Sequence, residues 1–233
     1  MCIRDRQEIT DPEKEIDADF IIDCRGRKAR DKDNLDTIVN PLNSVLLASL
    51  PKRELLWTES VAHPNGWCFI VPTEDKLSLG YLYNSGLTSK EEATKDFQQR
   101  FGIEGIEHSM KFDNYCSFNP FSESGRVLKN GNSAAFIEPL EATATGLYLW
   151  IARVGYDRFI NKVDTPQCLH LLHKEVNSIA NFVLWHYKTG SKFNSPFWSH
   201  VNTLPFTEIQ KPKINETYGQ WDRRSFDVWE NNT

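Results

Sequence analysis

The sequence predicts an α+β protein with a sheet-rich first half and a helical second half. From residue 19 to residue 84, short runs of apolar and β-branched residues alternate with polar turns that contain Pro, Asn and Gly. After residue 143, apolar residues recur at helical spacing in two long stretches. The chain contains no internal repeat, so we expect one division, between a sheet-rich region of residues 1–130 and a second region of residues 131–233.

Apolar runs indicate the strands of the first region. Residues 19–24 predict a buried strand that ends at a polar turn, and the charged residues 28–36 predict a solvated loop. A sheet is expected over Val45–Leu50, Leu55–Ala62, Trp67–Val71 and Leu77–Tyr83. The last two runs flank the polar turn of residues 73–76, which predicts a hairpin.

Capping residues and apolar stripes indicate the helices. Ser89 and Glu92 form a capping box that begins a helix, with Arg100 near its end and Gly102 just beyond it. A second helix is expected over Thr143–Lys162. A third begins at the N-cap Thr165, followed by a proline, and runs to Lys188. The residues from 191 onward predict no regular element.

Charge and hydropathy exclude several classes of function. The chain has 233 residues, with 27 Lys and Arg against 32 Asp and Glu, a formal net charge of −5. The basic residues are scattered, so neither nucleic acid nor an anionic membrane surface is an expected partner. The longest apolar run, about residues 45–50, is far shorter than the roughly 20 residues of a membrane span. Residues 1–15 lack the apolar segment of a secretory signal, so a cytoplasmic location is expected.

Cysteine and histidine usage predicts no metal site. The five cysteines are odd in number and form no Cys-x-x-Cys pair, so we expect reduced thiols that are mostly buried. His170 and His173 are three residues apart on a predicted helix, but no third ligand is spaced to join them.

Residues 131–146, Gly-Asn-Ser-Ala-Ala-Phe-Ile-Glu-Pro-Leu-Glu-Ala-Thr-Ala-Thr-Gly, carry the strongest functional signal. Small residues are concentrated here, where larger side chains would keep a ligand away from the backbone. The segment also leads into a predicted helix, whose first N–H groups and partial positive charge suit an anion. A halide, a phosphate or the edge of a flavin ring would each satisfy such a site.

This segment resembles the second flavin-contacting segment of the flavin-dependent halogenases typified by the tryptophan halogenases, whose pattern is close to G-D-A-x-G-F-x-E-P-L-E-S-T-G. Other stretches agree in order and approximate spacing. Residues 20–26 are similar to a family strand that ends in Asp-x-x-Gly, residues 66–72 to its W-x-W-x-I-P motif, residues 79–93 to the family segment after that motif, and residues 186–198 to its His-Tyr … Asp-Thr-Pro-Phe-Trp region. The likeness extends over about residues 19–229.

The resemblance implies part of an FAD-dependent, monooxygenase-like FAD/NAD(P)-binding fold. Family members use FADH2 from a separate flavin reductase, together with O2, to oxidise halide, and a lysine beside the aromatic substrate receives the hypohalous acid. The expected partners are therefore a small indole-like or tryptophan-like substrate, a halide ion and the reductase. None of the twelve glycines forms the family's G-x-G-x-x-G turn, and no residue matches its essential lysine, so we expect a fragment cut at both ends, inactive by itself.

The resemblance also assigns roles to residues. Glu141 matches the carboxylate beside the substrate, which can hydrogen-bond the oxidant or accept a proton as a general base. The other matches are flavin contacts at Gly131, Asn132, Pro139, Asp23 and Gly26, halide contacts at Thr143 and Ala144, and tunnel residues at Trp67 and Phe69.

This sequence differs from the family motifs at four positions. Phe69 replaces the second tryptophan of the W-x-W motif and Asn132 replaces an aspartate, while Ala142 and Ala144 replace a serine and a glycine. Two alternatives remain open, a flavin monooxygenase that hydroxylates and an inactive remnant or binding module. Without the resemblance, the pattern of residues predicts different roles. Glu141 would then be a carboxylate that complements a helix dipole, and Trp67 and Phe69 would be core residues of a strand.

Overall fold

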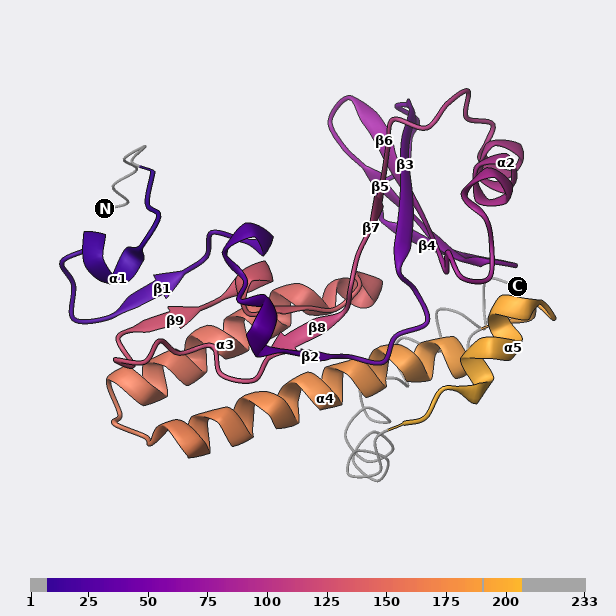
Figure 1. Cartoon of the computed structure of the whole chain (residues 1–233). Helices are drawn as coiled ribbons and strands as arrows, with labels where there is room; N and C mark the ends of the chain where they lie inside the picture. Colours follow the sequence, from indigo (N-terminus) through magenta and orange to yellow (C-terminus); the bar gives the residue numbers. More distant parts are fainter. Residues whose placement is uncertain (1–7, 190, 207–233) are drawn as a thin grey trace. The chain divides into compact units, whose positions relative to one another are not determined.

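The structure, a computed structural model, describes residues 8–189 and 191–206, and it contains both helices and sheets as expected (Figure 1). The chain divides into two compact units. The first unit combines Met1–Ile38 with Tyr115–Val176, and the second combines Val39–Asn114 with Asn177–Thr233. Each unit is thus built from two separate stretches of chain, whereas the sequence predicted one division between residues 130 and 131.

A five-stranded antiparallel sheet forms the centre of the second unit. Its strands, in spatial order, are β4 (Glu59–His63), β5 (Gly66–Pro72), β6 (Lys76–Tyr83), β3 (Ser44–Pro51) and β7 (His108–Lys111). The hairpin expected between β5 and β6 is confirmed, and the Thr73 N–H closes it by donating to the Lys76 carbonyl oxygen at 2.8 Å.

The expected strand over Leu55–Ala62 is wrong in its first half. β4 begins only at Glu59, which pairs with Ile70. The preceding residues, Leu56 and Trp57, lie outside the sheet and are 90% and 63% exposed. Apolar composition therefore marked a loop as a strand, because it cannot show where a pairing partner is available.

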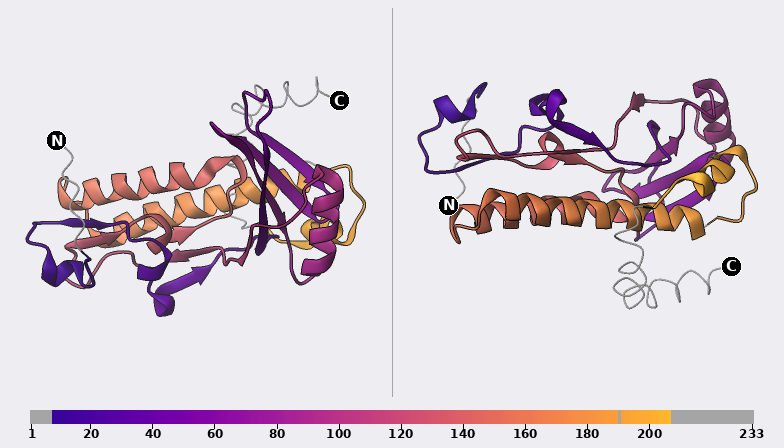
Figure 2. Two further views of the ribbon diagram at one scale, coloured as in Figure 1. Left: turned by 90° about the horizontal axis from the view of Figure 1, so that it is seen from above. Right: turned by 60° about the horizontal axis from the view of Figure 1, so that its bottom comes forward.

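Helix α2 (Lys90–Phe101) covers one face of this sheet (Figures 1 and 2). The Ser89 hydroxyl accepts from the Glu92 N–H, and the Glu92 carboxylate accepts from the Ser89 N–H at 3.0 Å, so the expected capping box is confirmed. Gly102 ends the helix with a left-handed φ of 65°. Ala93 and Phe97 are buried against the sheet.

Helix α5 (Pro196–Thr203), also in the second unit, corrects the expectation of irregular chain after residue 191. The Ser195 hydroxyl accepts from the Trp198 N–H, and Pro196 occupies the first turn. The helix buries Phe197, Trp198 and Val201. It has only eight residues, too few to show clear periodicity.

The first unit contains two small sheets. Strand β1 (Ile21–Asp23) pairs in parallel with β9 (Val127–Lys129), and the antiparallel sheet β10–β8–β2 consists of Ala135–Phe136, Tyr115–Ser117 and Leu35–Thr37. The short helix α1 (Pro12–Glu15) and the 3₁₀ turns Arg27–Ala29, Lys32–Asn34, Gly131–Ser133 and Leu140–Ala142 complete this part.

The expected solvated loop over residues 28–36 is wrong in part. This segment contains two 3₁₀ turns and enters β2, and it packs on an aromatic side chain. The guanidinium carbons of Arg27 and Arg30 lie 5.7 and 5.1 Å from the ring centroid of Tyr115. Cation–π contacts of this kind let a charged segment pack rather than remain in solvent.

Two helices pack with these strands (Figure 2). α3 (Thr143–Phe159) approaches β9 closely, because a Cβ added at Gly155 would lie 2.6 Å from Leu128 Cδ2. α4 (Thr165–Thr189) starts in the first unit and ends in the second. Both predicted helices are confirmed, with small corrections at their ends.

The corrections concern residues near 162 and 165. α3 stops at Phe159, before Lys162, which has a left-handed φ of 58°. The cap of α4 is Asp164 rather than Thr165, since the Asp164 carboxylate accepts from the Gln167 N–H at 2.7 Å. The Asp164 carboxylate, one residue before Thr165, thus caps the free N–H of Gln167 in the first turn of the helix.

Three of the five cysteines, Cys68, Cys116 and Cys168, are buried free thiols, and Cys24 is an exposed one. This confirms the expectation for these four residues, while Cys2 lies outside the described range. Among the described residues, none of the helices has the length and apolar character needed to cross a bilayer.

Candidate functional site

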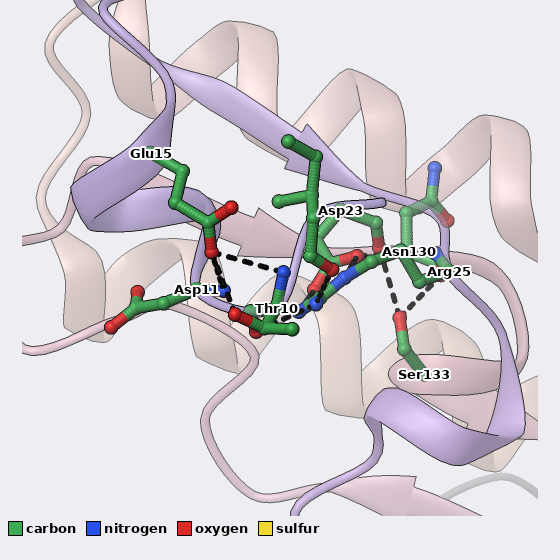
Figure 3. Close-up of polar contacts among 8 residues, drawn as sticks. Thr10, Asp11, Glu15, Asp23, Arg25, Asn130 and Ser133 are labelled. Atoms are coloured by element: carbon green, nitrogen blue, oxygen red, sulfur yellow. Dashed lines mark hydrogen bonds and ion pairs between the residues drawn. The ribbon is translucent and has the colours of Figure 1, made fainter. Parts of the chain in front are cut away.

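Asp23, at the end of β1, forms an ion pair with Arg25 (Figure 3). Its carboxylate is buried, and its two oxygens accept from Arg25 Nε and Nη2, each at 2.9 Å. Burial opposes ionisation of this group, but the hydrogen bonds and charge of Arg25 outweigh that effect, so the pKa of Asp23 lies below its ordinary value. The carboxylate is therefore held ionised and in a fixed orientation.

Arg25 also binds the main chain of the N-terminal segment, and so connects that segment to the end of β1. Its Nη1 donates to the carbonyl oxygens of Ile9 and Thr10, both at 2.8 Å. The Glu15 carboxylate in turn accepts from Thr10 and from the Asp11 N–H, as Figure 3 shows. Both oxygens of Asp23 are thus engaged within the protein, and its assignment as a flavin contact stays a prediction.

The main-chain oxygen of Asp23 connects β1 to the 3₁₀ turn Gly131–Ser133. It accepts from the Asn130 N–H and from the Ser133 hydroxyl, each at 2.9 Å. The Asn130 side chain accepts from the Gly131 N–H at 2.7 Å. Two of the segments that the sequence singled out, one ending in Asp23 and one starting at Gly131, therefore meet.

Gly26 and Gly131 mark this junction from its two sides. Gly26 precedes the 3₁₀ turn Arg27–Ala29, which contacts the turn Gly131–Ser133. The two glycines have φ of 79° and 63°, a region that other residues rarely adopt. A Cβ added to either would meet no atom within 4 Å. Conformation therefore selects glycine at both positions, and the space where a side chain would begin is empty.

Two tyrosines hold Asn132 in place. The Tyr115 hydroxyl donates to the Asn132 main-chain oxygen at 2.6 Å, and the Tyr148 hydroxyl donates to the side-chain oxygen of Asn132. The Asn130 side chain adds a link to α3, since its Nδ2 donates to the Tyr148 carbonyl oxygen at 3.2 Å. Sequence reasoning missed both tyrosines because they lie 17 and 16 residues from Asn132 in no motif of their own.

At the start of α3, the Thr143 N–H donates to the Leu140 main-chain oxygen in the preceding 3₁₀ turn. The N-cap of α3, Ala142, makes no side-chain capping bond, and the first turn contains no acidic side chain. Ala142 has a φ of 52°, an uncommon value for a non-glycine residue. Thr143 and Ala144 are half-buried, and Ala144 has helical backbone geometry. Glu141 lies in the preceding 3₁₀ turn, Leu140–Ala142, and Pro139 is exposed.

Trp67 and Phe69 belong to the second unit, on the same face of β5. The indole N–H of Trp67 donates to the Tyr187 hydroxyl oxygen at 2.7 Å, and Trp67 is buried. The ring of Phe69 lies over Gly80, where a Cβ would come within 2.1 Å of Phe69 Cζ. The ring centroids of Trp67 and Phe69 are 6.2 Å apart. Both aromatic rings are thus fixed by neighbours in the same unit.

Known proteins resemble this chain over most of its length. A family model described as tryptophan halogenase matches residues 5–233. The tryptophan 7-halogenase RebH of Lentzea aerocolonigenes is 23% identical over 219 residues, which cover 86% of this chain and 41% of RebH. The tryptophan 7-halogenase KtzQ of Kutzneria sp. (strain 744) is 27% identical over 227 residues, covering 88% and 42%.

A solved structure has the same fold. Xcc4156, a flavin-dependent halogenase from Xanthomonas campestris, aligns with a TM-score of 0.71 at 17% identity over 87% of this chain and 43% of that chain. The chain spans about two fifths of the length of the curated relatives it matches.

Proposed function

This chain belongs to the tryptophan halogenase family, and on that premise we propose that it forms the flavin-facing, halide-binding and tunnel-lining part of a flavin-dependent halogenase. The complete enzyme would halogenate an electron-rich, indole-like aromatic compound with FADH2 from a separate reductase, O2 and halide. The related proteins are named as halogenases, which does not favour the hydroxylating alternative.

The junction of Gly26 and Gly131 is the observation that carries this proposal. Two glycines with left-handed φ, each open where a Cβ would stand, lie at two 3₁₀ turns that contact each other: Gly26 before Arg27–Ala29 and Gly131 in Gly131–Ser133. Such a junction fits a flat ring that must approach the backbone closely. The residues present therefore fit a flavin, and the parallel pair of β1 and β9 agrees with part of an FAD-binding fold.

Each remaining residue has a distinct task in this proposal. Bound FADH2 supplies the electrons with which O2 oxidises the halide. The backbone at Thr143 and Ala144 holds the halide at the start of α3, where the helix dipole favours an anion. Trp67 and Phe69 line the passage to the substrate and keep the substrate from the flavin. Glu141 hydrogen-bonds the oxidant or removes the proton from the cationic arene.

The chain by itself should bind FAD weakly. Its twelve glycines include no G-x-G-x-x-G turn, which holds the diphosphate of a dinucleotide. The turn around Gly131 contacts only one edge of the cofactor in this proposal. Activity is therefore expected of the complete enzyme that contains this sequence, and not of these 233 residues alone.

Product mass tests the proposal. The complete enzyme is supplied with FAD, a flavin reductase, NADH, air and tryptophan or indole, once with chloride and once with bromide. A halogenase gives a product whose mass changes with the halide. A product that gains oxygen in both reactions would establish the hydroxylating alternative, and flavin oxidation with no aromatic product would establish an inactive remnant.

A further inference from the structure

Trp67 is held by a side chain from a distant part of the sequence. Its indole N–H donates to the hydroxyl oxygen of Tyr187, in α4, at 2.7 Å across 120 residues. Both side chains are buried, with 5% and 4% exposure. A buried indole N–H needs an acceptor, since water cannot replace a lost partner there. The hydrogen bond therefore restricts how the indole plane can turn.

Tyr187 is in turn held by α5. Its ring centroid lies 6.2 Å from that of Phe197 and 6.0 Å from that of Trp198. The indole N–H of Trp198 donates to the main-chain oxygen of His63 at 2.9 Å. The partner of Trp67 is thus a side chain with little freedom of its own.

The same helix also holds the turn that precedes Trp67. The Ser195 hydroxyl, at the start of α5, donates to the Pro64 main-chain oxygen, next to the oxygen that Trp198 binds. Tyr187, at the end of α4, therefore binds the Trp67 side chain. Ser195 and Trp198, in and next to the first turn of α5, bind the main chain at the β4–β5 turn. These contacts all lie within the second unit.

We propose that Tyr187 is a positioning residue that sets the orientation of the Trp67 indole. The consequence for catalysis rests on the proposed function, in which Trp67 lines the passage for the oxidised halide. A free indole would leave that passage wider and open to water, so oxidised halide would escape before it meets the substrate. Loss of Tyr187 should then lower the yield of halogenated product per O2 consumed, while flavin oxidation continues at its normal rate.

The indole N–H resonances of this 233-residue chain test the positioning directly. In Tyr187→Phe, the ¹H–¹⁵N resonance of Trp67, assigned by its absence in Trp67→Phe, should move and exchange with D2O about tenfold faster. The Trp198 resonance should stay in place, because its acceptor is a main-chain oxygen. Tyr156→Phe, which removes the hydroxyl of a half-exposed tyrosine in α3, should alter neither resonance.

Two results of this measurement would overturn the proposal. In one, the Trp67 resonance is the same in Tyr187→Phe as in the wild type, so the hydroxyl does not hold the indole. In the other, the Trp67 and Trp198 resonances shift together, so the substitution disturbs the packing of α5 as a whole.

The complete enzyme tests the catalytic consequence. Tyr187→Phe should give several-fold less halogenated product per O2, with unchanged flavin oxidation and with Tyr156→Phe at the wild-type ratio. An unchanged ratio in Tyr187→Phe would overturn the catalytic part. If the wild-type enzyme makes no halogenated product, the proposed function fails, and the resonances still decide whether Tyr187 positions Trp67.

Discussion

The hydroxyl group of Ser133 donates a hydrogen bond to the main-chain oxygen of Asp23 at 2.9 Å, across 110 residues of sequence. It also lies 2.7 Å from the main-chain oxygen of Asn130. Ser133 is fully buried, so one small side chain joins the end of β1 to the turn that carries Gly131. The proposed flavin junction depends on this connection.

Ser133→Ala should lower the free energy of unfolding by about 1–2 kcal/mol, because it removes a buried donor and leaves buried carbonyl oxygens with fewer partners. Urea unfolding measures the change. The exposed serine Ser199 provides the control, and Ser199→Ala should stay within about 0.5 kcal/mol of the wild type. Equal stability of Ser133→Ala and the wild type would show that the connection contributes nothing.

Ala142→Gly should stabilise the protein by about 0.5–1 kcal/mol. Ala142 has a φ of 52°, where a Cβ costs about 1–2 kcal/mol, partly offset by the greater freedom of glycine in the unfolded chain. In contrast, Ala152→Gly in the middle of α3 should destabilise by about 0.5–1 kcal/mol. The melting temperatures of the two variants should shift in opposite directions. A lower melting temperature for Ala142→Gly would show that the backbone of Ala142 is not strained.

Gly80→Ala should displace the ring of Phe69 and destabilise the second unit by about 1–3 kcal/mol, since the new Cβ would come within 2.1 Å of Phe69 Cζ. Phe69→Ala removes the clash, so Gly80→Ala should cost much less in that background, which a double-mutant cycle measures. Gly105, with no atom within 4 Å of its Cβ position, gives the matched control Gly105→Ala. Equal costs of Gly80→Ala in both backgrounds would refute the contact.

His63 should make the folded state sensitive to acid. Its ring is fully buried and stacks on Tyr81 with centroids 3.7 Å apart. Burial lowers the pKa of His63 to about 3, against the opposing effects of the Trp67 main chain and Asp96. The unfolded state, with a pKa near 6.5, binds a proton first as the pH falls, so stability from this residue is present above about pH 6.5 and is lost between about pH 6.5 and 3.

His63→Phe removes this titration. Between pH 7 and pH 4.5 the wild type should lose about 2–3 kcal/mol more than the variant does, as urea unfolding at each pH would show. His108→Phe, at an exposed histidine, should follow the wild type. If the wild type and His63→Phe lose stability in parallel, His63 is not the acid-sensitive group.

Glu141→Gln in the complete enzyme should lower product formation by about 100-fold or more, because an amide cannot accept the proton of the arene, while O2 still oxidises the flavin. Product and O2 consumption are measured together. Glu123→Gln, at an exposed carboxylate, is the control and should leave both unchanged. Normal product formation by Glu141→Gln would remove Glu141 from the mechanism.

The sequence correctly predicted the elements whose signals lie in residues close together in the chain. The capping box at Ser89, the polar turn between β5 and β6 and the apolar stripes of α3 and α4 were all read correctly, because each depends on residues a few positions apart. Strands β7, β8 and β9 have three or four residues each and no clear alternation, and the sequence did not predict them. Their pairing partners lie tens of residues away, so their stability is a tertiary property.

The sequence by itself determined the α+β class, the main sheet, the long helices and the family likeness. Periodicity, helix caps and motifs each depend on residues that lie within a short stretch of sequence. Only the tertiary structure decided that Ser133 joins Asp23 to the Gly131 turn and that two tyrosines hold Asn132. It also decided that the Tyr187 hydroxyl oxygen accepts the hydrogen bond of the Trp67 indole. These contacts join residues that are up to 120 positions apart, and they form because polar groups that become buried need hydrogen-bond partners within the fold.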